Sequence, residues 1–267
     1  MEFEYFDVHC HIFSPDLRYG EDFGFSEEEK QILFQKLQEQ KIGILNCAHS
    51  DHALRELMSM KDLPGVYLSA GFHPESIPEF DEQLLGDIIQ NLPITAIGET
   101  GLDNYYLKKE VFNPETYTLS WERQIEIFEK HIEIGKKHRL ALSVHLRGER
   151  EVFQTAYTLF QKHAPLPATN LHFYTGGKKM IKQFADLGCF FSFGGALLLA
   201  QDIQETLKVI PEDRILSETD APFMAPVKGE KNTPLSVIAV VEKISEIRGK
   251  DIKEKLVKNA KNYLHIA

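Results

Sequence analysis

The sequence has few of the features that mark secreted, membrane-spanning or cofactor-binding proteins. Only three of its 267 residues are cysteines, and they lie far apart, so the chain carries no disulfide framework and suits a reducing cytoplasm. Its first residues are acidic and aromatic, and no apolar stretch approaches the roughly 20 residues of a membrane helix. The sequence therefore predicts a cytoplasmic protein with neither signal peptide nor membrane span.

Basic residues are also outnumbered by acidic residues. The chain has 40 acidic and 30 basic residues, which gives a formal net charge of −10. A broad basic surface for nucleic acid is therefore not expected. The charge is still compatible with a phosphate substrate held at a local site, particularly one that carries metal cations.

Eight short apolar runs alternate with longer amphipathic segments. The runs cover residues 4–10, 41–48, 65–72, 94–99, 140–145, 169–174, 188–193 and 214–219. One amphipathic segment opens with a capping box from Ser26 to Glu29, the signature of a helix start. Alternating strands and helices predict a parallel sheet, and the absence of G-x-G-x-x-G after the first run disfavours a dinucleotide fold. We therefore expect a distorted TIM (β/α)8 barrel, one domain over residues 1–267.

Ionisable side chains gather at the ends of these runs, where the active sites of such barrels lie. The residues so placed are His9, His11, His73, Glu99, His145, His172 and Asp220. Chance would scatter them among helices and strand starts. The carboxyl end of the barrel is therefore the predicted site.

The stretch "DVHCH" places Asp7, His9 and His11 at alternate positions. Strict alternation would point these three side chains into the barrel, and Val8 and Cys10 towards the helices. Polar groups left unpaired in such an interior cost several kcal/mol, roughly, so they need a partner.

A metal centre would supply that partner. Four imidazoles at strand ends favour two cations over one, and Glu99 lies where it could bridge them. Imidazole-rich sites favour Zn or Mn over Mg, which prefers oxygen ligands. Two cations about 3.5–4 Å apart suit displacement at phosphorus.

Six motifs give the chain a family resemblance. "DVHCH", "GFHP", "AIGETGLD", "VHLR", "LHFYTGG" and "ETDAPFMAP", between residues 7 and 226, resemble in order and spacing the TatD family of metal-dependent hydrolases. The resemblance implies a TIM barrel of the amidohydrolase superfamily with two metal ions (Zn, Mn or Mg) and DNase activity. One branch of the family is credited with deacylating D-aminoacyl-tRNA.

The resemblance also implies roles for individual residues. His9, His11, Glu99 and Asp220 would bind one metal, and Glu99, His145 and His172 the second. Asp220 would also orient or deprotonate the attacking water, which makes Asp220 and Glu99 the catalytic pair. The residues expected to support these ligands or contact substrate are Asp7, His73, Asp103, Arg147 and Glu218.

The sequence departs from the family pattern at positions expected to bear on substrate binding, and at none of the predicted metal ligands. Phe13 stands where the family usually has Asp, Leu146 changes "HSR" to "HLR", and "KGEKN" at 228–232 replaces "RGxRN". The basic loops "GGKKM" and "KGEKN" are expected to bring local positive charge to the rim of the site. His49 and His52 are weaker candidates for that rim.

The histidines on or near the helices are expected at the surface. They are His131, His138, His163 and His265.

The leading interpretation is a monomeric deoxyribonuclease that attacks DNA ends with a metal-activated water. A D-aminoacyl-tRNA deacylase or a small-molecule phosphoesterase is the alternative, because the same water can attack acyl carbon or phosphorus. Cyclic-amide hydrolases are disfavoured because Glu99 stands where they carry a carboxylated lysine. A barrel without catalysis is disfavoured because no expected ligand is missing.

Overall fold

Eight parallel strands form a single sheet in the order β1 to β8. The computed structural model describes residues 2–15, 24–110, 114–227 and 229–267. The strands are β1 (Tyr5–Cys10), β2 (Ile42–Cys47), β3 (Val66–Ala70), β4 (Ile94–Asp103), β5 (Ala141–Arg147), β6 (Thr169–Leu171), β7 (Phe190–Phe193) and β8 (Ile215–Ser217).

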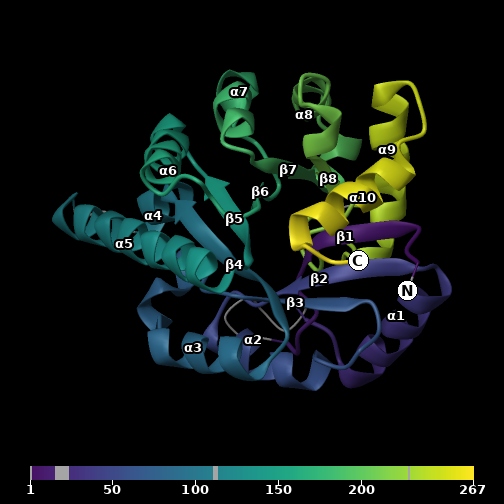
Figure 1. Cartoon of the computed structure of the whole chain (residues 1–267), viewed down its shortest axis with the longest axis horizontal. Coiled ribbons are helices and arrows are strands. Elements are labelled where there is room, and N and C mark those ends of the chain that lie inside the picture. Colours follow the sequence, from purple (N-terminus) through teal and green to yellow (C-terminus); the bar gives the residue numbers. More distant parts are fainter. Residues whose placement is uncertain (1, 16–23, 111–113, 228) are drawn as a thin grey trace.

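Helices follow the strands and surround them (Figure 1). The α-helices are α1 (Glu27–Glu39), α2 (Asp51–Glu56), α3 (Glu82–Asn91), α4 (Asn104–Glu110), α5 (Pro114–His138), α6 (Arg150–Lys162), α7 (Lys178–Asp186), α8 (Gln201–Leu207), α9 (Val237–Arg248) and α10 (Lys253–Leu264). Short 3-10 helices are η1 (Leu57–Met60), η2 (Pro74–Glu79), η3 (Gly195–Leu198), η4 (Glu212–Arg214) and η5 (Pro234–Ser236). The predicted TIM barrel is confirmed. Among the described ranges, no helix combines the length and apolar character needed to cross a membrane.

Two strand ends differ from the sequence prediction in ways that matter for the site. β4 continues to Asp103 instead of ending at Glu99, and β6 ends at Leu171, so that His172 follows the strand. Beyond Ile97, where its pairing with β3 ends, β4 continues along β5 alone, which supplies backbone partners as far as Arg147.

Hydrogen bonds between the ends of β8 and β1 complete the nearly closed barrel. The Asp220 N–H donates to the His9 carbonyl (2.9 Å), and the His11 N–H donates to the Ala221 carbonyl (2.6 Å). The Ser217 hydroxyl donates to the Phe6 carbonyl (2.8 Å). The first and last strands are therefore fixed to each other beside the predicted ligands.

β1 does not alternate strictly, and the prediction for Val8 is wrong. Its register with β2 shifts between Asp7 and Cys10. Val8 lies with Phe6 in a cluster that includes Leu45, Ala141, Leu216 and residues of α10, whereas Cys10 and Ile12 belong to the larger cluster between the sheet and the helices. Such an irregularity lets the side chains of two consecutive residues point to the same face of the strand.

Two glycines let β4 approach β5 closely around Glu99. Gly98 and Gly101 have φ values of 148° and 144°, which side chains rarely adopt. A Cβ on Gly98 would lie 2.4 Å from the Ser143 carbonyl oxygen, and one on Gly101 would lie 2.0 Å from that of His145. These contacts fix Glu99 beside the end of β5.

In the helix layer the capping box is confirmed, whereas the surface expectation is wrong for His131 and holds only in part for His163, whose side chain is 11% exposed and lies 2.5 Å from Glu129. The capping box of α1 is formed, with the Ser26 side chain accepting from Glu29 N–H and the Glu29 carboxylate accepting from Ser26 N–H. His131 of α5 is fully buried rather than at the surface. Its Nδ1–H donates to the Ile127 carbonyl (2.7 Å), so its Nε2 accepts the Phe72 N–H (3.2 Å). Helical periodicity marked this face, but the charged neighbours of His131 in the sequence hid its burial.

Candidate metal centre

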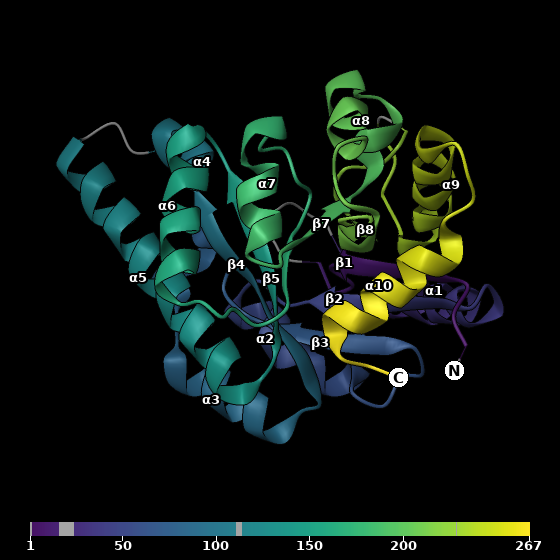
Figure 2. The same ribbon diagram turned by 45° about the horizontal axis from the view of Figure 1, so that its top comes forward.

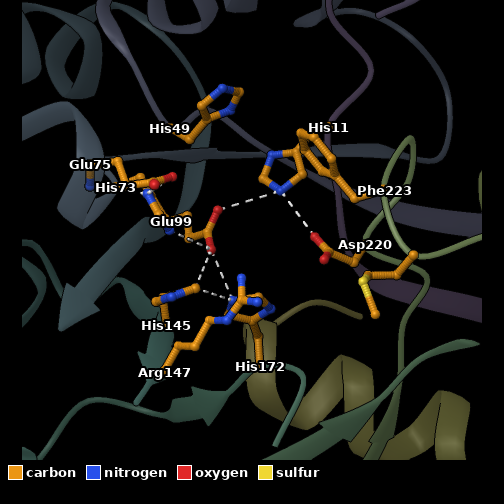
Figure 3. A pocket seen from close by; sticks show the side chains of 11 residues that line it. His11, His49, His73, Glu75, Glu99, His145, Arg147, His172, Asp220 and Phe223 are labelled. Atoms are coloured by element: carbon orange, nitrogen blue, oxygen red, sulfur yellow. Dashed lines mark hydrogen bonds and ion pairs between the residues drawn. The ribbon is translucent and has the colours of Figure 1, made fainter. Parts of the chain in front are cut away.

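The predicted ligands meet in one cavity at the carboxyl end of the barrel (Figure 3). Its volume is about 200 Å³, and Glu99 lies between two groups of histidines. His9, the one predicted ligand that does not line the open cavity, lies buried behind His11.

The first group consists of His9, His11 and Asp220 around one oxygen of Glu99. The Nε2 atoms of His9 and His11 are 3.1 Å apart. Glu99 Oε2 lies 3.6 Å from His9 Nε2 and 3.4 Å from His11 Nε2, and Asp220 Oδ1 lies 3.8 and 3.4 Å from the same atoms. Ligands about 2.1 Å from a tetrahedral cation are about 3.4 Å apart, so these four atoms have the spacing of a coordination sphere.

The second group lies around the other oxygen of Glu99. Glu99 Oε1 is 3.0 Å from His145 Nδ1 and 2.8 Å from His172 Nε2, and these two nitrogens are 3.1 Å apart. The His172 ring also stacks on the His9 ring at 3.9 Å between centroids. The two groups are thus adjacent and share a single carboxylate.

Hydrogen bonds on the far side of His11 and His145 leave a lone pair on the ring nitrogen that faces Glu99. His11 Nδ1 lies 2.7 Å from the Cys47 carbonyl, which can only accept, so His11 Nε2 carries no proton in the neutral ring. His145 Nε2 lies 2.9 Å from Asp103 Oδ2, which can only accept, so the neutral His145 ring has its lone pair on Nδ1. His9 Nδ1 lies 2.8 Å from Ser143 Oγ, a hydroxyl that orients the ring but can either donate or accept. Partners of this kind fix ring orientation and make the facing nitrogen available to a metal.

His73 has the opposite arrangement. Its Nδ1 accepts the Glu75 N–H (3.1 Å) at the start of η2, so the neutral ring carries its proton on Nε2, 3.7 Å from Glu99 Oε1. Burial lowers the pKa of His73 to about 3, which keeps the ring neutral near pH 7. His73 therefore faces the cavity as a hydrogen-bond donor.

Asp7 and Glu218 are buried behind the ligands and bond mainly to the backbone and to hydroxyls. Asp7 accepts from the His9 N–H (3.1 Å) and from the N–H and hydroxyl of Thr219 (3.0 and 2.6 Å). Glu218 accepts from the Phe173 N–H and the Ser192 hydroxyl, both at 2.6 Å. Burial raises the pKa of Asp7 against these hydrogen bonds.

Glu99 and Asp220 are the two carboxylates that lie among these histidines. Burial alone would raise the pKa of Glu99, but His73, His172 and His9 outweigh it and hold this pKa well below its usual range. Burial likewise opposes ionisation of Asp220, and the neighbouring His11 lowers its pKa overall. Both groups are therefore anionic near pH 7, as metal ligands must be.

The predicted positive rim is only partly formed. Arg147 lines the cavity and lies 4.5 Å from the Tyr105 ring centroid. Lys231 instead pairs with Glu29 (2.7 Å) and donates to the Gly24 carbonyl, while Lys178 lies 3.7 Å from Glu205. Lys228 of "KGEKN" lies outside the described residues.

The other two residues predicted for the rim, His49 and His52, differ in position. His49 lines the cavity, whereas His52 lies 3.0 Å from Glu56 on α2. Sequence reasoning missed Glu75, Phe223 and Met224, which also line the cavity. Glu75 lies in η2 after β3, and Phe223 and Met224 lie in the loop after β8. Their signals in the sequence were a position just after a strand and, for Phe223 and Met224, a place within the motif "ETDAPFMAP".

The donor set fits divalent cations. Imidazole nitrogens with fixed lone pairs and anionic carboxylates suit Zn, Mn or a related ion. Two groups that share the oxygens of one glutamate would suit either one or two such ions.

A comparison with protein families gives one match over most of the chain. The family of TatD-related DNases matches residues 6–265. An uncharacterized metal-dependent hydrolase of Methanocaldococcus jannaschii is 27% identical over 94% of this chain and 92% of its own length. YcfH of Escherichia coli K12, also an uncharacterized metal-dependent hydrolase, is 29% identical over 93% of this chain and 89% of its own.

Solved structures give the same fold. YjjV, a TatD homologue of E. coli K12, superposes with a TM-score of 0.82 and 21% identity over the whole of both chains. A TatD-family hydrolase of Entamoeba histolytica gives a TM-score of 0.78 at 18% identity over 98% of both chains.

Proposed function

The chain belongs to the family of TatD-related DNases, whose relatives are metal-dependent hydrolases, and from that premise we propose that it hydrolyses phosphodiester bonds of DNA with two divalent cations. The observation that carries this proposal is the position of Glu99. Its Oε2 faces His9 and His11, and its Oε1 faces His145 and His172. A carboxylate placed in this way is suited to bridge two cations.

Cations held there would act as Lewis acids on a phosphoryl oxygen and raise the acidity of water. Asp220 would accept the proton of the attacking water. Its side chain is 15% exposed, against 6% for Glu99, so it is the central carboxylate most open to solvent. Its lowered pKa keeps it ready to accept a proton near neutral pH.

His73 and Arg147 would hold the phosphate. The Nε2–H of neutral His73 can donate to a phosphate oxygen without adding a charge. Arg147 would supply a permanent positive charge and a planar pair of donors. Asp103 would keep His145 oriented, and Asp7 and Glu218 would hold the backbone around the ligands.

The dimensions of the site favour a strand end as substrate. The cavity is small, about 200 Å³, and the chain is acidic overall. A long duplex would gain little from such a surface. We therefore propose an exonuclease that acts as a monomer on single-stranded or frayed DNA ends.

Single-turnover cleavage of end-labelled single-stranded DNA tests the proposal. The metal-stripped protein would receive Mg, Mn or Zn, and bound metal would be counted by mass spectrometry. We expect metal-dependent shortening from one end and two equivalents of metal per chain. Glu99→Ala and Asp220→Ala should abolish cleavage, whereas Glu133→Ala, an exposed carboxylate on α5, should not change it.

Two results would contradict the proposal. Turnover of D-aminoacyl-tRNA by a protein that leaves DNA intact in every metal would exclude the nuclease. Full activity with a single equivalent of metal would exclude the two-cation site while leaving hydrolysis in place.

A further inference from the structure

The metal centre opens in two directions. Besides the cavity described above, a second cavity of about 260 Å³ shares His145, Arg147, His172, Asp220 and Met224 with it. Its own walls are Leu146, Phe173 and Thr175, which do not line the first cavity. A molecule bound at the metal ligands could therefore extend directly into a partly apolar space.

Phe173 is held in an unfavourable backbone conformation at this wall. Its φ is 45°, in the left-handed region that a bulky side chain rarely occupies. The Glu218 carboxylate fixes it by accepting the Phe173 N–H at 2.6 Å. A Cβ added to Gly194 would lie 3.0 Å from a ring carbon of Phe173, so the absence of a side chain there makes room for the ring.

Met224 shows the same feature on the β8 side. Its φ is 51°, and the residue is 50% exposed although its side chain is apolar. Asp220, which also lines the second cavity, has a φ of 59°. Three non-glycine residues in left-handed conformations thus line one cavity. Strain of about 1–3 kcal/mol at each such residue persists where the fold holds a functional geometry.

We propose that the second cavity binds the nucleobase of the nucleotide whose phosphate lies at the metal centre, with the Phe173 ring as its stacking surface. This inference rests on the proposed function. The occupant must carry an anion, because Arg147 and the metal ligands form one side of the space. It must also carry a planar apolar part, because Phe173, Leu146 and Met224 form the other.

Stacking does not depend on which base is present. Leu146 is buried, and Thr175 contributes one hydroxyl, so the walls offer few groups that could read a base edge. Base–aromatic stacking is sequence-tolerant because every base has a π face. The site therefore accepts nucleotides of any base and discriminates against a sugar phosphate that lacks one.

Calorimetric binding to the Mn-reconstituted protein tests this. The two ligands are thymidine 5′-monophosphate and 2-deoxyribose 5-phosphate, which carries a hydroxyl at C1 in place of the base. We expect the nucleotide to bind about tenfold to a hundredfold more tightly. Phe173→Ala should remove most of this difference, and Phe173→Trp should keep it. Phe34→Ala, which truncates a half-buried ring on α1, is the matched control and should leave both affinities unchanged.

Equal affinities in the unaltered protein would overturn the proposal, as would a preference for the nucleotide that survives in Phe173→Ala. Thermal unfolding and metal content of Phe173→Ala would establish that the variant is folded and loaded. A variant that fails either check would be replaced by Phe173→Leu, which keeps the apolar contact with Gly194 but offers no ring. If the protein cleaves no DNA, the proposed function fails, and the binding comparison still decides whether the base site exists.

Discussion

The two ends of this barrel are built from the same eight strands but bury opposite kinds of side chain. At the amino end, Phe3, Phe6 and Tyr67 lie in edge-to-face or tilted contact, and Tyr263 of α10 is fully buried among them and their neighbours. Figures 1 and 2 show α10 beside β1 at this end. At the carboxyl end, the buried groups are imidazoles and carboxylates around an open cavity.

The two ends are therefore expected to contribute to different properties, the amino end to stability and the carboxyl end to the chemistry of the site. Burying an aromatic side chain stabilises the fold by about 1.5–3 kcal/mol, without regard to any ligand. Burying a carboxylate is unfavourable unless hydrogen bonds or opposite charges compensate it. Substitutions at the amino end should therefore act on folding, and those at the carboxyl end on metal binding and turnover.

The largest effect is expected for Glu99→Ala at the carboxyl end. Loss of the shared carboxylate should lower kcat/KM by at least about a thousandfold, because both groups of ligands lose a member. Bound metal should fall by at least one equivalent, while the circular dichroism spectrum should not change. A variant that retains both equivalents of metal would show that Glu99 does not join the two groups.

At the amino end, Tyr263→Ala should lower the free energy of unfolding by about 3–5 kcal/mol, the usual result of removing a buried aromatic ring. Metal content and turnover per folded molecule should stay the same. Tyr263→Phe is the control, since it keeps the ring and removes the hydroxyl that donates to the Leu142 carbonyl (3.0 Å), which should cost about 1 kcal/mol. Loss of metal from folded Tyr263→Ala would break the separation between the two ends.

His131 should make the helix layer sensitive to acid. Burial lowers its pKa from 6.5 to about 4, so between these values the unfolded chain binds a proton that the folded chain does not. Acid therefore favours unfolding, and the free energy of unfolding should fall by about 3 kcal/mol as the pH drops from 6.5 to 4.

Denaturant titrations of the protein and of His131→Gln at several pH values measure this contribution. Glutamine can still accept the Phe72 N–H but does not titrate, so the two curves should converge as the pH falls. Parallel curves would mean that His131 is not the source of the acid sensitivity.

The smallest effect is expected within the carboxyl end, where it compares the His145 and His172 group with the group that contains His9. Asp103→Asn should weaken metal binding at the His145 and His172 group by about ten- to a hundredfold, because an amide no longer fixes the His145 proton. Ser143→Ala should act instead on the group that contains His9. Metal titrations that show the same sites affected in both variants would contradict two separately supported groups.

Much of this architecture could be predicted from the sequence because it depends on local rules. Eight apolar runs and the helices between them define the barrel, and the Ser26–Glu29 capping box defines where α1 begins. The predicted ligands meet because the carboxyl ends of adjacent parallel strands lie side by side. None of these inferences required knowledge of which distant side chains touch.

The errors arose where tertiary contacts override a local pattern. Val8 lies in a different cluster from Cys10 and Ile12 because the register of β1 shifts between Asp7 and Cys10, and the sequence of the run does not indicate that shift. His131 has charged neighbours in the sequence but occupies the buried face of its helix. Lys231 was expected at the rim, yet Glu29, about 200 positions earlier, lies close enough to pair with it.

By itself, the sequence determined the barrel, the gathering of ionisable residues at its carboxyl end and the family to which the chain belongs, because periodicity and motif spacing are properties of the chain alone. Only the tertiary structure decided which oxygen of Glu99 faces which histidines, and that His73 presents a proton where His11 presents a lone pair. It also decided that Phe173 lines a second cavity. These features depend on hydrogen-bond partners and walls from other strands, which come within a few ångströms only after folding.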